Sequence, residues 1–185
     1  MDRRVLALDT ATRRATVALC EGETILAEHA REVTTHSEGL LALVQRVLDE
    51  SCLTADRLDG VACGRGPGSF TGLRIGLATA KGLCLAADLP LVCLSSLLPL
   101  ARAAAPAAGQ RAVLAVLDAR RGEVFSGLFG AGAAAGSAQV WPPEELGRRA
   151  PDLVRAPMQV RNASADDTAA AGNADVKPVS SRAPV

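Results

Sequence analysis

The residues of this sequence best suited to chemistry form one glycine-rich segment between a short β-prone run and an apolar helical run. Backbone N–H groups at the start of a helix can hold a phosphate or a carboxylate, so such a segment is a candidate anion site. The same glycines also suit a tight turn and close packing of the following helix, and we favour this structural interpretation. The segment comprises Gly64, Arg65, Gly66, Pro67, Gly68, Ser69, Phe70, Thr71 and Gly72.

Neither of the common nucleotide-binding fingerprints fits this segment. A Walker loop needs a lysine directly after its last glycine and then a serine or threonine, whereas Lys81 follows Ala80 and precedes Gly82. A dinucleotide-binding loop needs a glycine at its last fingerprint position, where a count from Gly64 places Ser69. The pattern therefore does not predict a nucleotide site by itself.

The other candidate ligands for a metal or phosphate stand apart from one another. Asp9 follows the first apolar run and could contact a phosphate or a metal, but we favour a turn that its side chain stabilises by a hydrogen bond to the backbone. His29 and His36 are the only histidines, and neither has a second ligand one helical turn away. We therefore expect no metal site.

The candidate nucleophiles and acid/base groups are equally isolated. Cys63 and Cys84 lie in apolar runs, so we interpret them as small buried hydrophobic residues and not as reactive thiols. Asp118, Arg120 and Glu123 could form an acid/base cluster, but a charged hairpin turn is the interpretation we favour. The residues thus predict no catalytic site and no cofactor.

The elements that would position these groups follow clear periodic patterns. Alternation of apolar and polar residues predicts an antiparallel meander of three strands, and apolar residues at the helical period predict the helix that comes next. The sequence therefore predicts an α/β fold with a mixed sheet and helices packed on it. The expected strands are 5–9, 15–20, 24–29, 59–64, 90–94, 112–117 and 123–129, and the expected helices are 36–50, 73–87 and 95–105.

Composition divides the chain into three parts. We expect residues 1–129 to form the folded lobe, because the periodic patterns end there. Residues 130–150 are rich in small residues and read as a linker, with a possible short helix after Trp141. Residues 151–185 contain many alanines and prolines and few large apolar groups, so we expect weak order there.

Charge and composition narrow the expected location and partners. The formal net charge is +0, so there is no overall positive field for nucleic acid, and only 2% of the residues are aromatic, which leaves few platforms for base stacking. The 5 cysteines do not form a disulfide framework. No run of about 18 apolar residues occurs. We expect a cytoplasmic protein without membrane contact that reaches RNA only indirectly.

The glycine-rich segment and its flanks resemble one family. The run Gly64-Arg-Gly-Pro-Gly-Ser-Phe-Thr-Gly-Leu-Arg-Ile-Gly76 is similar to the signature of the TsaB family of bacterial tRNA threonylcarbamoyladenosine biosynthesis proteins. Supporting matches are Leu6 to Thr10, Thr35 to Glu38, Leu94 to Leu97 and Leu117 to Arg120. The resemblance covers roughly residues 4 to 129, and its glycine-rich run is long enough to be specific.

The resemblance implies a fold like that of the actin-like, sugar-kinase-like ATPases in a protein without their chemistry. It implies a non-catalytic scaffold and activator in the tRNA N6-threonylcarbamoyladenosine modification complex. Such a protein would bind TsaD and, with it, TsaE, would form a homodimer when alone and would meet tRNA only through the complex. The alternatives are a weak nucleotide-binding ATPase and, less favoured, a metallopeptidase.

The family's interface uses its first two helices, which the resemblance places here on the helices over 36–48 and 73–87. The second of these is apolar on nearly all sides, as a helix between a sheet and a partner would be. The alternative is that both faces are buried within one domain. The expected interface residues are His36, Leu40, Leu43, Val44, Val47, Leu73, Leu77, Ala80, Lys81 and Cys84.

Overall fold

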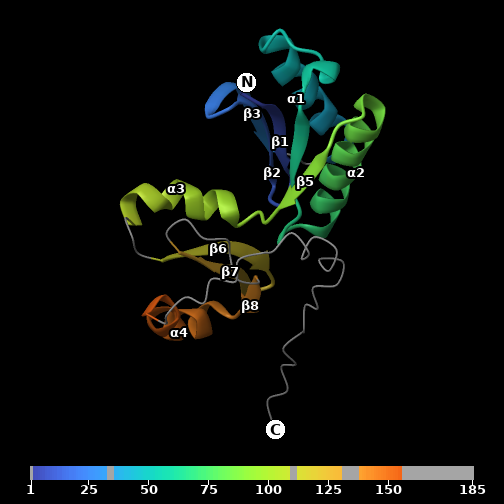
Figure 1. Ribbon diagram of the computed structural model, residues 1–185. Helices are drawn as coiled ribbons and strands as arrows, with labels where there is room; N and C mark the ends of the chain where they lie inside the picture. The colour runs from blue at the N-terminus through green and yellow to red at the C-terminus, as the bar shows by residue number, and fades with distance from the viewer. Residues whose placement is uncertain (1, 33–35, 109–111, 131–137, 156–185) are drawn as a thin grey trace.

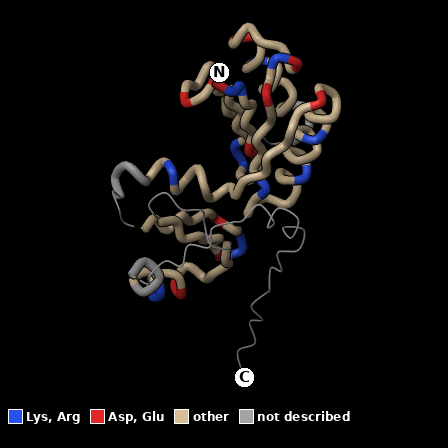
Figure 2. Tube along the Cα trace, viewed as in Figure 1, with Lys and Arg blue, Asp and Glu red and all other residues tan. Residues whose placement is uncertain are grey.

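Two β-sheets with helices beside them make up the part of the chain that the computed structural model describes, which is residues 2–32, 36–108, 112–130 and 138–155 (Figure 1). The first sheet and its two helices form one lobe, and the second sheet with its helices forms a smaller lobe below it in the view of Figure 1. Basic and acidic residues are interspersed along the trace in Figure 2, in keeping with the formal net charge of +0.

The first sheet has five strands in the order β3-β2-β1-β4-β5. Its first three strands form an antiparallel meander, while β4 and β5 join parallel to β1. The parallel strands need crossover helices, which α1 and α2 supply. The bounds are β1 Arg4–Asp9, β2 Arg14–Glu21, β3 Thr24–Glu32, α1 His36–Glu50, a 3-10 turn Ala55–Arg57, β4 Gly60–Gly64, α2 Phe70–Ala87 and β5 Leu91–Leu94.

Both α1 and α2 pack on the same face of this sheet and against each other. The face is apolar because alternate strand residues such as Leu6, Leu8 and Val17 point to it and are buried. In α1 the buried residues recur every three or four positions, from Leu40 to Leu48, which is the apolar stripe of an amphipathic helix. This packing forms the main hydrophobic core.

The second sheet has three antiparallel strands in the order β6-β7-β8, namely β6 Val113–Arg120, β7 Glu123–Phe129 and β8 Gln139–Trp141. Helix α3, Leu98–Ala108, packs on β6. Leu97, just before this helix, and Ala101 within it form a small second core with Ala115 and Phe129. Helix α4, Pro143–Arg155, contacts β6 and β7.

These observations confirm the expected α/β fold, with its mixed sheet, its opening meander and helices packed on the sheet. They differ from expectation in the second lobe, where a short helix was expected and a third strand and a helix of 13 residues occur. Residues 151–155 form the end of α4, whereas residues 156–185 lie outside the described part, so the weak order expected for 151–185 stays a prediction beyond α4. Among the described residues, no helix is both long and apolar enough to span a membrane.

Candidate functional site

The glycine-rich segment connects β4 to α2 and lies against the turn between β1 and β2. Ser69 is the N-cap of α2, and its Oγ accepts a hydrogen bond of 3.3 Å from the N–H of Gly72. The Ser69 N–H in turn donates to the carbonyl of Ala11 at 2.7 Å. Because Ser69 caps it, the helix begins at Phe70, three residues before the position expected from the sequence.

Several glycines of the segment are in close contact with the β1–β2 turn. A Cβ on Gly64 would overlap the carboxylate of Asp9, and one on Gly68 would overlap the carbonyl oxygen of Ala11. Within α2, a Cβ on Gly72 would overlap the carbonyl oxygen of Thr10. These glycines are therefore required for close packing, which supports the structural interpretation of the segment over an anion site.

Asp9 ties the same turn to the start of α3. Its Oδ1 accepts a hydrogen bond of 2.7 Å from the N–H of Ala11, which is the turn expected from the sequence. Its Oδ2 accepts from the Oγ of Ser96 at 2.5 Å. Ser96 Oγ also accepts from the N–H of Gly66 at 3.2 Å. Both carboxylate oxygens of Asp9 thus have partners within the protein.

A second set of polar residues surrounds a cavity of about 510 Å³ between the segment and the β6–β7 hairpin. Arg13, Ser69, Thr71 and Arg120 contribute polar groups, and Phe70 and Phe125 contribute aromatic rings; Ala11, Thr12, Gly68, Leu117, Asp118 and Ala119 complete the lining. The Oδ1 of Asp118 accepts a hydrogen bond of 2.7 Å from the N–H of Arg120, so the carboxylate stabilises the hairpin turn. The charged side chains of this lining are those of Arg13, Arg120 and Asp118.

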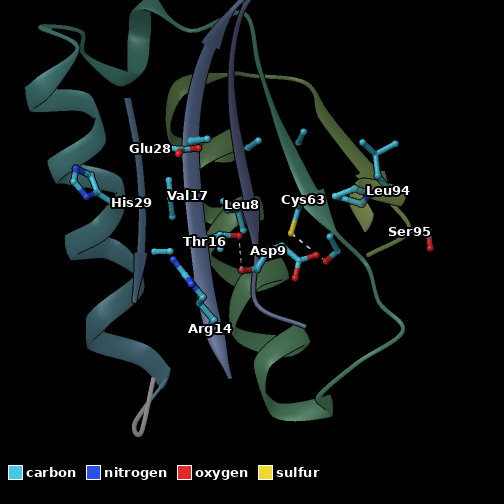
Figure 3. Close-up of a pocket in the computed structure, with 16 residues that line it drawn as sticks. Leu8, Asp9, Arg14, Thr16, Val17, Glu28, His29, Cys63, Leu94 and Ser95 are labelled. Atoms are coloured by element: carbon cyan, nitrogen blue, oxygen red, sulfur yellow. Dashed lines mark hydrogen bonds between the residues drawn. The ribbon is translucent and has the colours of Figure 1, made fainter. Parts of the chain in front are cut away.

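The face of the first sheet opposite α1 and α2 carries a cavity of about 470 Å³ (Figure 3). Small residues such as Ala7, Ala18 and Ala62 line its floor, with Asp9 and Glu28 at its polar positions. His29 instead points toward α1 in Figure 3, where its Nε2 lies 2.7 Å from Oε2 of Glu50. Among the described lining residues, no acid/base pair has both of its members on the cavity wall.

The cysteines near the glycine-rich segment form no disulfide, and Cys63 and Cys84 among them are buried. All five cysteines are free. Burial, and to a lesser extent the nearby Cys93, Asp9 and Cys84, raise the pKa of the Cys63 thiol to about 12. Burial also raises the pKa of Cys84. Thiols with raised pKa are poor nucleophiles, which agrees with their interpretation as small hydrophobic residues. Within the described ranges, no group of three or more ligating side chains could hold a metal ion.

The structure corrects the expected interface residues of α1 and α2. Six of the ten are buried in the main core, where they already contact the sheet or the neighbouring helix: Leu40, Leu43, Val44, Val47, Ala80 and Cys84. They cannot also present their side chains to a partner. Leu73 and Leu77 are half-buried and Lys81 is exposed, while the side chain of His36 lies outside the described part.

The surface of these two helices consists of other residues. In α2 the buried positions are Gly72, Gly76, Ala80 and Cys84, four residues apart, so the small residues mark the side that faces the protein interior. The sequence analysis instead assigned two of them, Ala80 and Cys84, to a partner, and it missed the large exposed side chains. Leu85 is 87% exposed, Phe70 is 73% exposed and, in α1, Leu41 is 54% exposed. The sequence could have shown that Leu85 is exposed, because it lies one residue after Cys84 and so outside the row of small residues four positions apart.

Comparison with known proteins identifies relatives for this architecture. The family model described as TsaD: tRNA N6-adenosine threonylcarbamoyltransferase matches residues 26–146. The tRNA threonylcarbamoyladenosine biosynthesis protein TsaB of Escherichia coli (strain K12) is 43% identical over 122 residues, covering 66% of this chain and 53% of that protein. The protein of the same name in Bacillus subtilis (strain 168) is 33% identical over 126 residues, with 68% and 54% coverage.

The structural comparison agrees. YeaZ from Pseudomonas aeruginosa superimposes with a TM-score of 0.69 at 36% identity, over 76% of this chain and 68% of that one. The chain spans about half the length of the curated relatives it matches. The residues that the family model matches, 26–146, include the glycine-rich segment and both helices of the first lobe. The chain therefore belongs to the family described as TsaD: tRNA N6-adenosine threonylcarbamoyltransferase, and the resemblance to TsaB indicated by its glycine-rich segment is confirmed.

Proposed function

We propose that this chain acts in tRNA threonylcarbamoyladenosine biosynthesis as a non-catalytic subunit of the cytoplasmic modification complex. In this role it binds TsaD and, with it, TsaE, forms a homodimer when alone and meets tRNA only through the complex. Support for the pathway comes from relatives named for it at 43% and 33% identity. Because the chain covers about half of those relatives, its activity and partners need direct tests.

The observation that carries the proposal is the pair of large apolar side chains on the outer surface of α2. Leu85 and Phe70 point away from a helix whose inner stripe is already buried, and Leu41 is exposed on the adjacent α1. The guanidinium carbon of Arg74 lies 5.4 Å from the centre of the Phe70 ring. Phenylalanine and arginine side chains are enriched at protein interfaces relative to the rest of the surface, and exposed leucines beside them extend the apolar area.

The non-catalytic part of the proposal is supported by the chemistry of the turn region. Both carboxylate oxygens of Asp9 accept hydrogen bonds, from the N–H of Ala11 and the Oγ of Ser96, and the pKa of the buried Cys63 thiol is raised. The glycines nearest the turn are required for packing. A catalytic role would need a nucleophile or base that is free to reach a substrate.

Size-exclusion chromatography with light scattering, on the chain alone and mixed with TsaD from the same source, tests the proposal. We expect a homodimer alone and a one-to-one complex in the mixture. Leu85→Asp should weaken the complex by at least about tenfold, because it places an uncompensated charge at the centre of the interface. Leu100→Asp is the matched control, because Leu100 is 43% exposed but lies on α3.

Three results would count against the proposal. The first is a stable monomer that forms no complex with TsaD. The second is equal loss of binding in Leu85→Asp and Leu100→Asp, which would indicate general damage. The third is unchanged binding in Leu85→Asp, which would leave TsaD binding in place but move the interface off α2.

A weak nucleotide-binding activity is the alternative, favoured by the cavity between the glycine-rich segment and the β6–β7 hairpin. If it holds, ATP alone should raise the stability of the chain, by about 2.7 kcal/mol at a hundredfold excess over its dissociation constant. Arg13→Ala, at the cavity wall, should remove that increase. The scaffold proposal predicts no increase with ATP in either protein.

A further inference from the structure

Three of the free cysteines meet where α2 packs on β4 and β5. Cys63 lies on β4, Cys93 on β5 and Cys84 on α2. Besides burial, Cys93, Asp9 and Cys84 raise the pKa of the Cys63 thiol, and Cys93 likewise adds to the effect of burial on the pKa of Cys84. These mutual effects place the three thiols close together.

Cys63 and Cys93 are direct neighbours across the first sheet. The register of the parallel strands β4 and β5 pairs Cys63 with Cys93, one position before Gly64 pairs with Leu94. Side chains at paired positions of neighbouring strands point to the same face of the sheet. Neighbouring strands lie about 4.7–4.9 Å apart, within the Cα separation of about 4.4–6.8 Å that a disulfide spans. The two thiols can therefore be bridged with little movement of the backbone.

Cys84 is a poorer partner for Cys93. It lies on the helix above the sheet and not on a neighbouring strand, and its Sγ donates a hydrogen bond of 3.8 Å to the carbonyl oxygen of Pro90. Pro90 precedes Cys93 by three residues, which is roughly 10 Å along an extended strand. Cys63 is therefore the nearer partner.

The two neighbouring thiols differ in exposure. Cys93 is exposed, so a small oxidant reaches it directly. Cys63 is 1% exposed, and its Sγ donates a hydrogen bond of 3.5 Å to the carbonyl oxygen of Gly64 (Figure 3). Burial protects Cys63 from reagents in solution, but not from a sulfur atom held next to it at high effective concentration. A thiolate of high pKa is also the stronger nucleophile once it has lost its proton.

We propose that Cys93 and Cys63 form a reversible disulfide, which links β5 to β4, when the chain meets a hydroperoxide. With hydrogen peroxide, the Cys93 thiolate attacks one peroxide oxygen, the O–O bond breaks, and hydroxide leaves the new sulfenic acid. The Cys63 thiolate then attacks the Cys93 sulfur, the S–O bond breaks, and a second hydroxide leaves. The protons of the two thiols convert both hydroxides to water. Two thiols are thus oxidised to one disulfide, and the peroxide is reduced to two waters.

The geometry of the sheet makes this disulfide easy to reduce. The Cβ atoms of a relaxed disulfide lie about 3.8 Å apart, which is less than the spacing between strands. The bond is therefore strained, and strained disulfides are the labile ones. The link also holds β5, which has only 4 residues, against β4. It lies apart from the outer face of α2, so the inference goes beyond the proposed function and does not depend on it.

Peptide mass spectrometry of the full chain, reduced and then treated with hydrogen peroxide, tests the proposal. We expect a link between the peptides of Cys63 and Cys93 that dithiothreitol removes. Hydrogen exchange of the β5 amides should slow in the oxidised chain and recover on reduction, because the link prevents separation of β5 from β4. Cys93→Ser, at an exposed position that tolerates substitution, should abolish both effects. Cys52→Ser, at another exposed thiol, is the matched control and should keep both.

Four other outcomes would overturn the proposal. Cys93 sulfinic acid without any disulfide would show that Cys63 does not reach it. A link from Cys93 to Cys84 would identify the wrong partner, and a link between two chains would make Cys93 an intermolecular site. Unchanged exchange of the β5 amides in a chain that carries the disulfide would show that the bond does not hold the strand.

Discussion

At the residue scale, the turn after β1 determines which side chains the glycine-rich segment can carry. Asp9, Thr10 and Ala11 each occupy the space where a Cβ would lie on Gly64, Gly72 or Gly68. Thr10 also donates a 2.8 Å hydrogen bond from its Oγ1 to the carbonyl of Gly72. The segment is thus a contact surface between α2 and β1, and its glycines can be tested one at a time.

Gly72→Ala should destabilise the protein, because the new Cβ meets the backbone carbonyl of Thr10, which cannot rotate away. We expect a loss of about 1–3 kcal/mol in the free energy of unfolding. Gly82→Ala in the same helix should increase it by about 0.5–1 kcal/mol, because no atom lies within 4 Å of the added methyl group and alanine favours helix. Urea denaturation of the two variants measures both changes in the free energy of unfolding. Equal changes would refute the role of Gly72 in close packing.

The Cys63 thiol should make stability fall at alkaline pH. Burial raises its pKa from 9.0 to about 12, so the native state retains a proton that the unfolded chain releases. The resulting stabilisation is complete below pH 9 and is lost as the pH rises toward 12. Denaturation at pH 8 and pH 10 should show a smaller loss in Cys63→Ala than in the parent chain. Cys52→Ala, at an exposed thiol, should behave like the parent.

At the element scale, periodicity was sufficient to predict the strands and helices of the first lobe but not the outward-facing side of α2. Most side chains of this helix are apolar, so its apolar pattern has no clear direction. Burial follows the small residues Gly76 and Ala80 because they allow the helix to approach β1 and its turn closely. From the sequence alone Leu85 resembles a core residue, and only the packing of α2 on the sheet shows that it is exposed.

Ala80 and Lys81 are adjacent on α2, but Ala80 lies on its buried face and Lys81 lies on its exposed face. Ala80→Glu should reduce the free energy of unfolding by about 3 kcal/mol or more, because it places a charge in a fully buried position. Lys81→Glu should change it by no more than about 0.5 kcal/mol, since Lys81 is exposed. Circular dichroism during thermal unfolding gives the comparison. A folded Ala80→Glu variant of normal stability would return Ala80 to the list of interface candidates.

At the scale of the whole molecule, the two lobes differ in how well sequence patterns specify them. The first sheet has long strands with clear alternation, and its core extends from β1 to α2. The second sheet depends on β8, only 3 residues long, whose pairing with β7 is not visible as a pattern in Gln139–Trp141. Such a strand forms only when its neighbour is already in place, so local sequence cannot predict it.

The unequal cores predict that the lobes unfold separately. Leu19 is completely buried in the main core, whereas Phe129 belongs to a small cluster with Leu97, Ala101 and Ala115. Phe129→Ala should therefore speed hydrogen exchange in β6 and β7 while leaving β1 and β2 protected. Leu19→Ala should lower the free energy of unfolding by about 2–5 kcal/mol and speed hydrogen exchange in the first sheet. If Phe129→Ala instead sped exchange equally in both sheets, the two lobes would be one cooperative unit, and the small cluster would stabilise the whole molecule.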